Sequence, residues 1–397
     1  MKIVFYRYNS ICEPDFIEAF KQTGLEVSEI TEEMYRKEIP AEERVRILLE
    51  RITPDAPLFV FSIDYFPFIS IVCERLGINY VSVIVDCPVA EIYSPTIRNS
   101  CNRVFFFDYL QFESVRDENK GNLHYLPLGA AVSRMDTLPY PGEYKYDISF
   151  IGSLYNEKDR YAALKESGAI EKNALAHLEE IIDKQKNVPG MDIIEEELLR
   201  SDIDALKNAD PEFYTDTEAV TDMDRYVAIN NYIGNHLTSM DRIRILNSLA
   251  EEFPGGRVHL FTRSDTSQIS KNVVVHGGVN TLTEMPQVFR SSLINLNLTS
   301  RTIRAGIPQR VWDILGAGAF CLTDYTDLLE GVIDPYECVG VFKNAEEIPQ
   351  MCRNYLDTPE VRENVMIRGY EMTAGCNTVL DRALHIVKYI LSEKMPG

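Results

Sequence analysis

The sequence predicts an α/β protein built from two doubly wound domains in tandem. Short apolar runs alternate with segments of helical periodicity along most of the chain. The runs are continuous in hydrophobicity, which is typical of strands buried on both faces of a parallel sheet. A length of 397 residues is enough for two domains of ordinary size. A cleft between two domains is therefore expected.

The first predicted domain covers residues 1–138. Its expected strands are Lys2–Tyr6, Leu58–Ser62, Tyr80–Val85, Arg103–Phe107 and Leu123–Leu126. Helical periodicity occurs between them at Glu13–Thr23, Ala41–Ile52 and Phe68–Leu76. Strands that alternate with helices in this way form βαβ units, which favour a parallel sheet with helices on both faces.

A second series of strands follows the linker Ser133–Tyr146, which contains two prolines and a glycine. It predicts a second α/β domain over residues 145–376. The expected strands are Tyr146–Ile151, Val258–Phe261, Val273–Val275, Leu293–Leu298, Phe320–Thr323 and Val339–Phe342.

One segment of the second domain departs from this alternation. Residues Tyr155–Arg257 have helical periodicity and almost no strand signal, which predicts a helical insertion at about residues 165–240. Its portion Asp192–Asp224 holds 12 acidic residues against Arg200 and Lys207. Such a charge run usually forms a solvated helical surface. The alternative is a subdomain that binds a partner or an acceptor.

The overall charge excludes some classes of partner. With 61 acidic and 40 basic residues, the net charge is −21, which is unsuited to clamping nucleic acid or to binding a membrane surface through basic residues. No apolar run approaches the roughly 20 residues needed to span a bilayer, and no signal-peptide pattern is present. We expect a cytoplasmic protein that binds no nucleic acid and has no transmembrane segment.

Cysteine and histidine spacing gives no indication of a metal site. The eight cysteines are never closer than 14 residues, and the six histidines are scattered. Neither pattern resembles the closely spaced ligand pairs of zinc sites.

The most informative motif is the stretch Asn295–Tyr325. It predicts a strand, a loop that closes on Gly306, and a helix that begins near Pro308. The free N–H groups of this helix start would form an anion site with Arg304 and Arg310 nearby. Asp313 is spaced to reach a ribose hydroxyl of a nucleotide bound there. The alternative is an ordinary β-loop-α unit with two surface arginines.

Further candidates for donor binding follow other strands of the second domain. Gly152 and Ser153 form a small turn that could present backbone amides to a phosphate or a sugar. Arg263 and His276 follow two later strands and could face a nucleobase or a phosphate, although such residues are more often structural. No dinucleotide-binding or P-loop glycine pattern occurs, which disfavours a dehydrogenase or a P-loop NTPase.

Three carboxylates follow strands of the first domain. Asp64, Asp86 and Asp108 lie where open α/β sheets place ligand contacts. Each could instead cap a helix or form a turn. We interpret Asp86 as the candidate general base of an inverting enzyme, and Asp64 and Asp108 as acceptor-side residues.

These stretches together resemble the CgeB-like (spore maturation protein-like) glycosyltransferases, preceded by their N-terminal domain of unassigned function. The block Asn295–Tyr325 is the most specific, because the family pattern resembles N-[LI]-T-x-R-[ST]-I-x-x-G-I-P-x-R-x-x-D. The other stretches that carry the resemblance are Phe61–Ser70, Tyr80–Pro88, Phe106–Asp108, Tyr125–Gly129 and Asp147–Ser153.

The resemblance implies a GT-B fold, in which two Rossmann-like domains face a cleft. The donor would bind the C-terminal domain and the acceptor the N-terminal one, and the C-terminal helix 377–394 would pack back on the first domain. Departures from the family at Val83, Asp64, Ala319 and Asp324 bear on the choice of acceptor. At the donor, matching positions place Gly306, Ile307, Arg310 and Asp313, with Arg301 and Arg304 as diphosphate contacts.

The predicted function is a metal-independent glycosyltransferase without a cofactor. It would transfer a sugar from a nucleotide-sugar donor, a UDP- or dTDP-sugar, to a saccharide, lipid-linked or protein acceptor. Two alternatives remain, because the fold does not by itself determine the function. They are a GT-B nucleotide-sugar epimerase and a non-catalytic protein that binds a nucleotide or a sugar.

Overall fold

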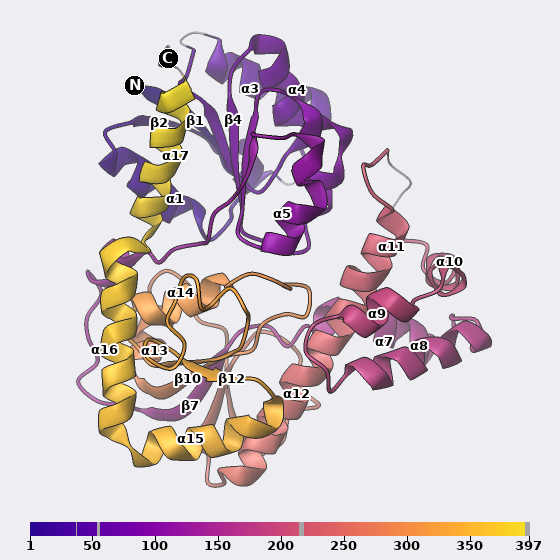
Figure 1. Ribbon diagram of the computed structural model, residues 1–397, viewed down its shortest axis with the longest axis vertical. Helices are drawn as coiled ribbons and strands as arrows, with labels where there is room; N and C mark the ends of the chain where they lie inside the picture. Colours follow the sequence, from indigo (N-terminus) through magenta and orange to yellow (C-terminus); the bar gives the residue numbers. More distant parts are fainter. Residues whose placement is uncertain (37, 54–55, 214–217, 394–397) are drawn as a thin grey trace.

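The computed structural model describes residues 1–36, 38–53, 56–213 and 218–393, and it contains two parallel six-stranded sheets (Figure 1). The first sheet has the order β2-β1-β3-β4-β5-β6. Its strands are β1 (Lys2–Tyr6), β2 (Glu26–Ile30), β3 (Val60–Ile63), β4 (Tyr80–Ile84), β5 (Asn102–Phe106) and β6 (Leu123–Tyr125).

The second sheet has the order β12-β11-β10-β7-β8-β9. Its strands are β7 (Tyr146–Ile151), β8 (Val258–Phe261), β9 (Val273–His276), β10 (Ser292–Asn297), β11 (Cys321–Asp324) and β12 (Gly340–Phe342). The two sheets lie in separate halves of the chain, and the prediction of two doubly wound α/β domains is confirmed.

Helices cover the faces of both sheets. In the first domain they are α1 (Glu13–Gln22), α2 (Glu32–Tyr35), α3 (Ala41–Ile52), α4 (Pro67–Leu76), α5 (Tyr109–Val115) and α6 (Val132–Met135). In the second domain they are α13 (Met285–Arg290), α14 (Gln309–Gly316), α15 (Ile348–Asp357) and α16 (Pro359–Cys376). Short 3₁₀ helices occur at Ala90–Tyr93, Pro95–Arg98, Arg116–Glu118, Asn156–Lys158 and Ala345–Glu347.

The strand orders define where ligands can bind. In a doubly wound sheet, ligands bind at the carboxyl ends of the two strands between which the winding reverses. In the first sheet these strands are β1 and β3, which lead to Tyr8 and Asp64. In the second sheet they are β7 and β10, which lead to Gly152 and Leu298.

The helical insertion lies between β7 and β8, and no strand occurs between these two within the described residues. It rests on the first domain: the Val220 N–H donates to the Tyr93 carbonyl at 2.8 Å, and the rings of Tyr93 and Tyr226 lie 4.7 Å apart. It is therefore more than a solvated surface. Its helices are α7 (Arg160–Ser167), α8 (Lys172–Gln185), α9 (Asp192–Glu197), α10 (Arg200–Ala209) and α11 (Met223–Val227), followed by a π-helical segment (Ala228–Gly234) and α12 (Asn235–Glu252).

The last helix, α17 (Val379–Glu393), returns to the first domain and runs beside α1 (Figure 1). Its apolar residues Ala383, Ile386 and Ile390 are fully buried. Its last residue, Glu393, pairs with Arg103 of β5 at 2.8 Å. Helical spacing of apolar side chains explains this packing, because one stripe of the helix is covered by the first domain.

The two chain crossings between the domains lie side by side. The Ala130 N–H donates to Asn377 O at 2.9 Å, and the Val379 N–H donates to Ala130 O at 3.0 Å. A Cβ at Gly129 would lie 2.7 Å from the Thr378 carbonyl carbon, so only glycine permits this approach. No helix of the described residues is long and apolar enough to cross a membrane.

Candidate donor and catalytic site

A cavity of about 690 Å³ lies between the two domains. Its second-domain walls come from the turn after β7, the end of β8 and the loop after β9, and the first-domain loop after β1 closes it. The cavity brings together four of the predicted donor residues: Gly152, Ser153, Arg263 and Arg310.

The turn after β7 lines this cavity and is fixed by hydrogen bonds. The Gly152 N–H donates to Phe261 O at 3.1 Å, and a Cβ at Gly152 would lie 3.1 Å from the Phe150 ring. The Ser153 hydroxyl donates to Glu157. A larger residue at position 152 would therefore disturb the turn that we expect to approach a ligand closely.

Arg242 of α12 joins the two strands between which the second sheet reverses. Its guanidinium donates to Ser153 O at 2.7 Å and to Leu298 O at 2.6 Å. Burial lowers the pKa of Arg242. Sequence analysis did not select this residue, because it lies inside a helix that has no glycine or proline signal nearby.

Arg310 and Asp313 lie on the first turns of α14. Arg310 lines the cavity, contacts the Met285 sulfur and lies 3.6 Å from the Asp313 carboxylate. Asp313 is 6% exposed and accepts a hydrogen bond from Gln309 at 3.0 Å. Burial lowers the pKa of Arg310 and raises that of Asp313, while each charge opposes the shift of the other. An arginine with one long ion pair can still bind an anion.

Arg263 lies across the cavity from the first domain and is exposed. A Cβ at Gly278 would lie 2.4 Å from the Arg263 side chain, which shows how closely this arginine lies on the loop after β9. It is in a position to reach a ligand in the cavity.

His276 does not line the cavity. Its ring stacks on Phe261 at 4.3 Å, and its Nε2 lies within hydrogen-bond distance of His259 Nδ1, at 3.1 Å. Burial lowers the pKa of His276. The histidine therefore packs within the second domain in this structure, and its contact with a nucleobase or a phosphate stays a prediction.

Arg301 and Arg304 hold the helical insertion. The Arg301 guanidinium donates to Asp241 at 2.7 Å, to Gly190 O at 3.0 Å and to Lys186 O at 3.1 Å. Arg304 pairs with Glu195. Both side chains are engaged by the protein itself, and both line a further cavity at the carboxyl ends of β10, β11 and β12. Their diphosphate contacts stay a prediction.

The loop that carries Gly306 and Ile307 is fixed to the first domain. The Asp108 carboxylate accepts the backbone N–H groups of Arg304 at 2.8 Å and Ala305 at 2.9 Å. A Cβ at Gly306 would lie 3.0 Å from the Phe107 ring, and Ile307 is 2% exposed in the core. Asp108, expected on the acceptor side, thus joins the two domains, and Gly306 and Ile307 help to hold the loop.

Two carboxylates meet at the carboxyl ends of β3 and β4. Asp64 is 8% exposed and accepts hydrogen bonds from the Tyr8 hydroxyl at 2.6 Å and the Val85 N–H at 3.0 Å. Burial and the neighbouring charge of Asp86 raise the pKa of Asp64 to about 7. Its φ of 51° is unusual for a residue other than glycine and often marks a functional position.

Asp86 is accessible to solvent. The pKa of its carboxyl is raised, because partial burial disfavours the charged form. The ammonium of Lys158 opposes this shift. Because Lys158 belongs to the second domain, Asp86 faces the region between the domains. Asp64 and Asp86 thus form a carboxylate pair of which Asp86 is the member nearer the second domain.

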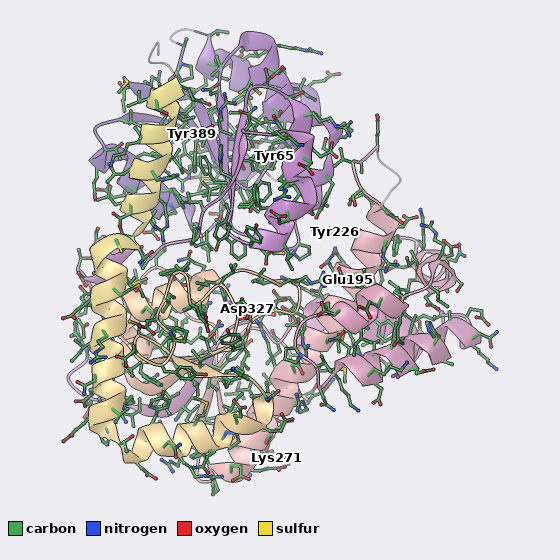
Figure 2. All side chains as sticks on the ribbon, in the orientation of Figure 1. Tyr65, Glu195, Tyr226, Lys271, Asp327 and Tyr389 are labelled. Carbon is green, nitrogen blue, oxygen red and sulfur yellow. The ribbon has the colours of Figure 1, made fainter. Side chains whose placement is uncertain are left out.

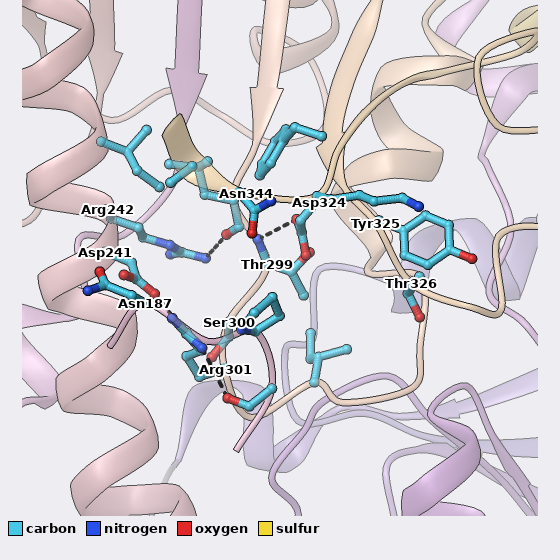
Figure 3. A pocket seen from close by; sticks show the side chains of 18 of the residues that line it. Asn187, Asp241, Arg242, Thr299, Ser300, Arg301, Asp324, Tyr325, Thr326 and Asn344 are labelled. Atoms are coloured by element: carbon cyan, nitrogen blue, oxygen red, sulfur yellow. Dashed lines mark hydrogen bonds and ion pairs between the residues drawn. The ribbon is translucent and has the colours of Figure 1, made fainter. Parts of the chain in front are cut away.

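A second cavity, of about 160 Å³, lies at the carboxyl ends of β10, β11 and β12 (Figure 3). Figure 3 shows Asp324 joined to Thr299, whose hydroxyl donates to the carboxylate at 2.7 Å. Burial raises the pKa of Asp324. Asp324 therefore fixes the start of the loop after β10. Within the described part of the chain, no group of three or more His, Cys, Asp or Glu side chains is arranged to hold a metal ion.

Comparison with known families matches residues 242–388 to the family described as Glycosyl transferase-like. This range contains α14 and the end of β10, where the most specific motif lies. Comparison with curated protein sequences gives no match.

Solved structures resemble the chain over almost its whole length. A glycosyltransferase from Rickettsia africae is 9% identical, with 98% of each chain covered and a TM-score of 0.53. Alr3699/HepE from Anabaena, in complex with UDP and glucose, is 9% identical over 99% of this chain and 100% of that one, with a TM-score of 0.55. T4 phage BGT, in complex with UDP and Mn²⁺, is 10% identical over 98% and 99%, with a TM-score of 0.52.

At these identities the likeness shows the fold, which is the GT-B fold of two Rossmann-like domains facing a cleft. The family match adds a glycosyl transferase-like domain over residues 242–388. Both findings agree with the class of enzyme that the sequence predicts, a nucleotide-sugar-dependent glycosyltransferase.

Proposed function

We propose that the protein is a glycosyltransferase that takes a sugar from a UDP- or dTDP-sugar and transfers it to a saccharide, lipid-linked or protein acceptor. The observation that carries this proposal is the cavity between the domains. It places Arg310 and the turn Gly152–Ser153 of the second domain against the loop after β1 of the first domain. Tyr8, at the start of that loop, donates a hydrogen bond to Asp64 at 2.6 Å. The UDP and glucose in the Anabaena structure support the choice of donor class.

On the donor side, Arg310 contacts the diphosphate and the turn Gly152–Ser153 approaches it closely. Charge-assisted contacts to phosphate are stronger than neutral hydrogen bonds. Asp313, which Gln309 holds in place, orients Arg310. Asp313 also contacts a ribose hydroxyl of the nucleotide, and measurements of nucleotide affinity test this contact.

On the acceptor side, Asp86 acts as general base for an inverting transfer. The acceptor oxygen forms a bond to the anomeric carbon, the bond from that carbon to the diphosphate oxygen breaks, and the acceptor proton passes to Asp86. Arg310 stabilises the charge that develops on the leaving diphosphate. Asp64 positions Asp86 by accepting its backbone N–H at 3.3 Å.

Within the glycosyltransferases, we place the chain in the CgeB-like group on the motif Asn295–Tyr325. We also propose a cytoplasmic location, which the eight free cysteines support, because disulfides are rare in reducing compartments. Metal independence is part of the proposal, since arginine side chains line the cavity where a diphosphate would bind.

The test begins with a thermal-shift screen against UDP, dTDP and their sugar conjugates, because a ligand of the folded state raises the melting temperature. Turnover is then followed as nucleoside diphosphate released and sugar gained by the acceptor, with and without EDTA. Sugar transfer that persists in EDTA supports the proposal. A changed sugar without transfer supports the epimerase, and binding without turnover supports a non-catalytic protein.

A further inference from the structure

A separate cavity of about 340 Å³ lies between α5 of the first domain and the helical insertion. Figure 2 shows Tyr226 and Glu195 of the insertion on the side that faces the first domain. Cys87, which directly follows Asp86, also lines the cavity.

Gln111, whose side-chain amide is buried and has no partner in the described part of the chain, lines the cavity. Gln111 of α5 is 5% exposed, and neither its Oε1 nor its Nε2 has a hydrogen-bond partner among the described residues. Its backbone N–H is held by Asp108 at 2.9 Å, which fixes the position of the residue. Buried amides are normally hydrogen-bonded, so an unpaired one that lines a cavity indicates a missing ligand.

The charged side chains around the cavity favour a neutral ligand, because the carboxylates of Asp108, Glu195 and Asp222 are engaged by the protein. Among the described residues that line it, both arginines are engaged by the protein: Arg225 donates to the carbonyls of Leu198 and Glu195, and Arg304 pairs with the Glu195 carboxylate. No cation in this part of the chain is left for a phosphate. An amide instead offers one acceptor and two donors, which suits the hydroxyl groups of a sugar.

We propose that this cavity binds a neutral sugar unit of the acceptor, so that the acceptor is a saccharide. The inference rests on the proposed glycosyltransferase function and specifies its acceptor class. The volume fits a small ligand, since sites for small molecules range upward from roughly 300 Å³. The helical insertion then completes an acceptor subsite that the first domain alone lacks.

The experiment measures the binding of neutral glycosides to the full-length protein. Methyl α- and β-glucopyranosides, galactopyranosides and mannopyranosides, together with maltose and cellobiose, are screened by saturation-transfer NMR. Gln111→Leu keeps the size of the side chain and removes its hydrogen-bonding atoms. Gln350→Leu is the matched control, because Gln350 is exposed on α15 and lines neither cavity. UDP affinity is measured in parallel by calorimetry.

At least one glycoside is expected to bind the wild type, with affinity at least tenfold weaker in Gln111→Leu and unchanged in Gln350→Leu. UDP should bind all three proteins equally. Binding of no glycoside, or equal binding by Gln111→Leu and the wild type, overturns the inference. If the wild type does not bind UDP, the proposed donor site is wrong. This outcome is distinct from a failure of glycoside binding, which overturns only the inference about the acceptor.

The folding of the variant is itself informative. Because the amide has no partner in the protein, Gln111→Leu should melt at the wild-type temperature or above. A lower melting temperature would show that the amide supports the fold, and this would overturn the inference. Gln111→Met provides a second apolar replacement, and it should show the same loss of glycoside binding.

Discussion

At the scale of single residues, donor binding depends on the charge of Arg310. Arg310→Ala removes the diphosphate contact, and we expect nucleotide-sugar affinity to fall by about ten- to a hundredfold, or roughly 1.5–3 kcal/mol. The melting temperature should stay near that of the wild type. Calorimetry with the donor checks this, with Arg353→Ala as a control, because Arg353 pairs with Glu252 on the surface. Wild-type affinity in Arg310→Ala would place the donor elsewhere.

Asp313→Ala tests the neighbouring residue separately. If Asp313 orients Arg310, the variant should also weaken nucleotide-sugar binding while the protein remains folded. The same calorimetric titration measures the affinity, and circular dichroism reports the fold. An unfolded variant would show that the buried carboxylate is structural.

Catalysis at the residue scale depends on Asp86. Asp86→Asn removes the base, and general-base assistance is typically worth about 10²–10⁴ in rate. We expect the transfer rate to fall within that range while donor affinity stays constant. The measurement is turnover at saturating donor, with affinity determined independently. Near-normal turnover would remove Asp86 from the mechanism.

The raised pKa of Asp64 predicts that the free energy of unfolding depends on pH. The folded state raises the pKa of its carboxyl to about 7, against roughly 3.9 in an unfolded chain. Between these values folding takes up a proton, so the contribution of Asp64 to the free energy of unfolding is largest below pH 4 and is lost as the pH rises toward 7. The slope is at most about 1.4 kcal/mol per pH unit.

Urea unfolding of the wild type and Asp64→Asn between pH 4 and 8 checks this. The free energy of unfolding of the wild type, relative to that of Asp64→Asn, should fall as the pH rises from 4 to 7. A constant difference would mean that Asp64 titrates near its ordinary pKa.

Which site residues can be predicted from sequence depends on their position in the chain. Gly152, Arg310 and Asp86 follow strands or begin a helix, and local patterns mark such positions. Arg242 and Lys158 lie within or beside helices, and only the tertiary fold brings Arg242 to the ends of β7 and β10 and Lys158 near Asp86. Conversely, Arg301 fits the motif, yet it donates to the carbonyls of Gly190 and Lys186, which belong to an insertion more than a hundred residues earlier in the chain.

At the scale of elements, the loop after β10 depends on Asp108 for its position. Asp108→Ala removes the acceptor of two loop N–H groups and the cap of α5. We expect the free energy of unfolding to fall by roughly 1–3 kcal/mol, because buried donors lose their partner. Denaturant titration measures this loss. An unchanged midpoint would show that the loop has another support.

The same scale shows why one strand was missed by sequence analysis. The predicted strands are runs of buried apolar residues, whereas β2 has the sequence EVSEI and lies at the edge of its sheet. An edge strand needs burial on fewer sides and can carry charged residues. Its pairing with β1 comes from the tertiary fold, and hydrophobicity alone does not reveal it.

At the scale of the whole molecule, α17 couples the C-terminus of the chain to the first domain. Ile386 is fully buried within a core cluster that includes Phe16 of α1. Ile386→Ala should lower the free energy of unfolding by about 2–5 kcal/mol. Thermal and urea unfolding measure this effect. A near-neutral result would mean that α17 is loosely attached.

The paired crossings at Ala130 and Thr378 limit how the enzyme can open and close. Because the two connections are neighbours, the domains can rotate about a hinge axis that passes through both, but they cannot twist freely relative to each other. A protease cut in the linker 133–146 would leave the halves joined through α17. After cleavage there, the two halves should therefore stay associated in one molecule, and the cleft should still be able to close on the side away from the hinge.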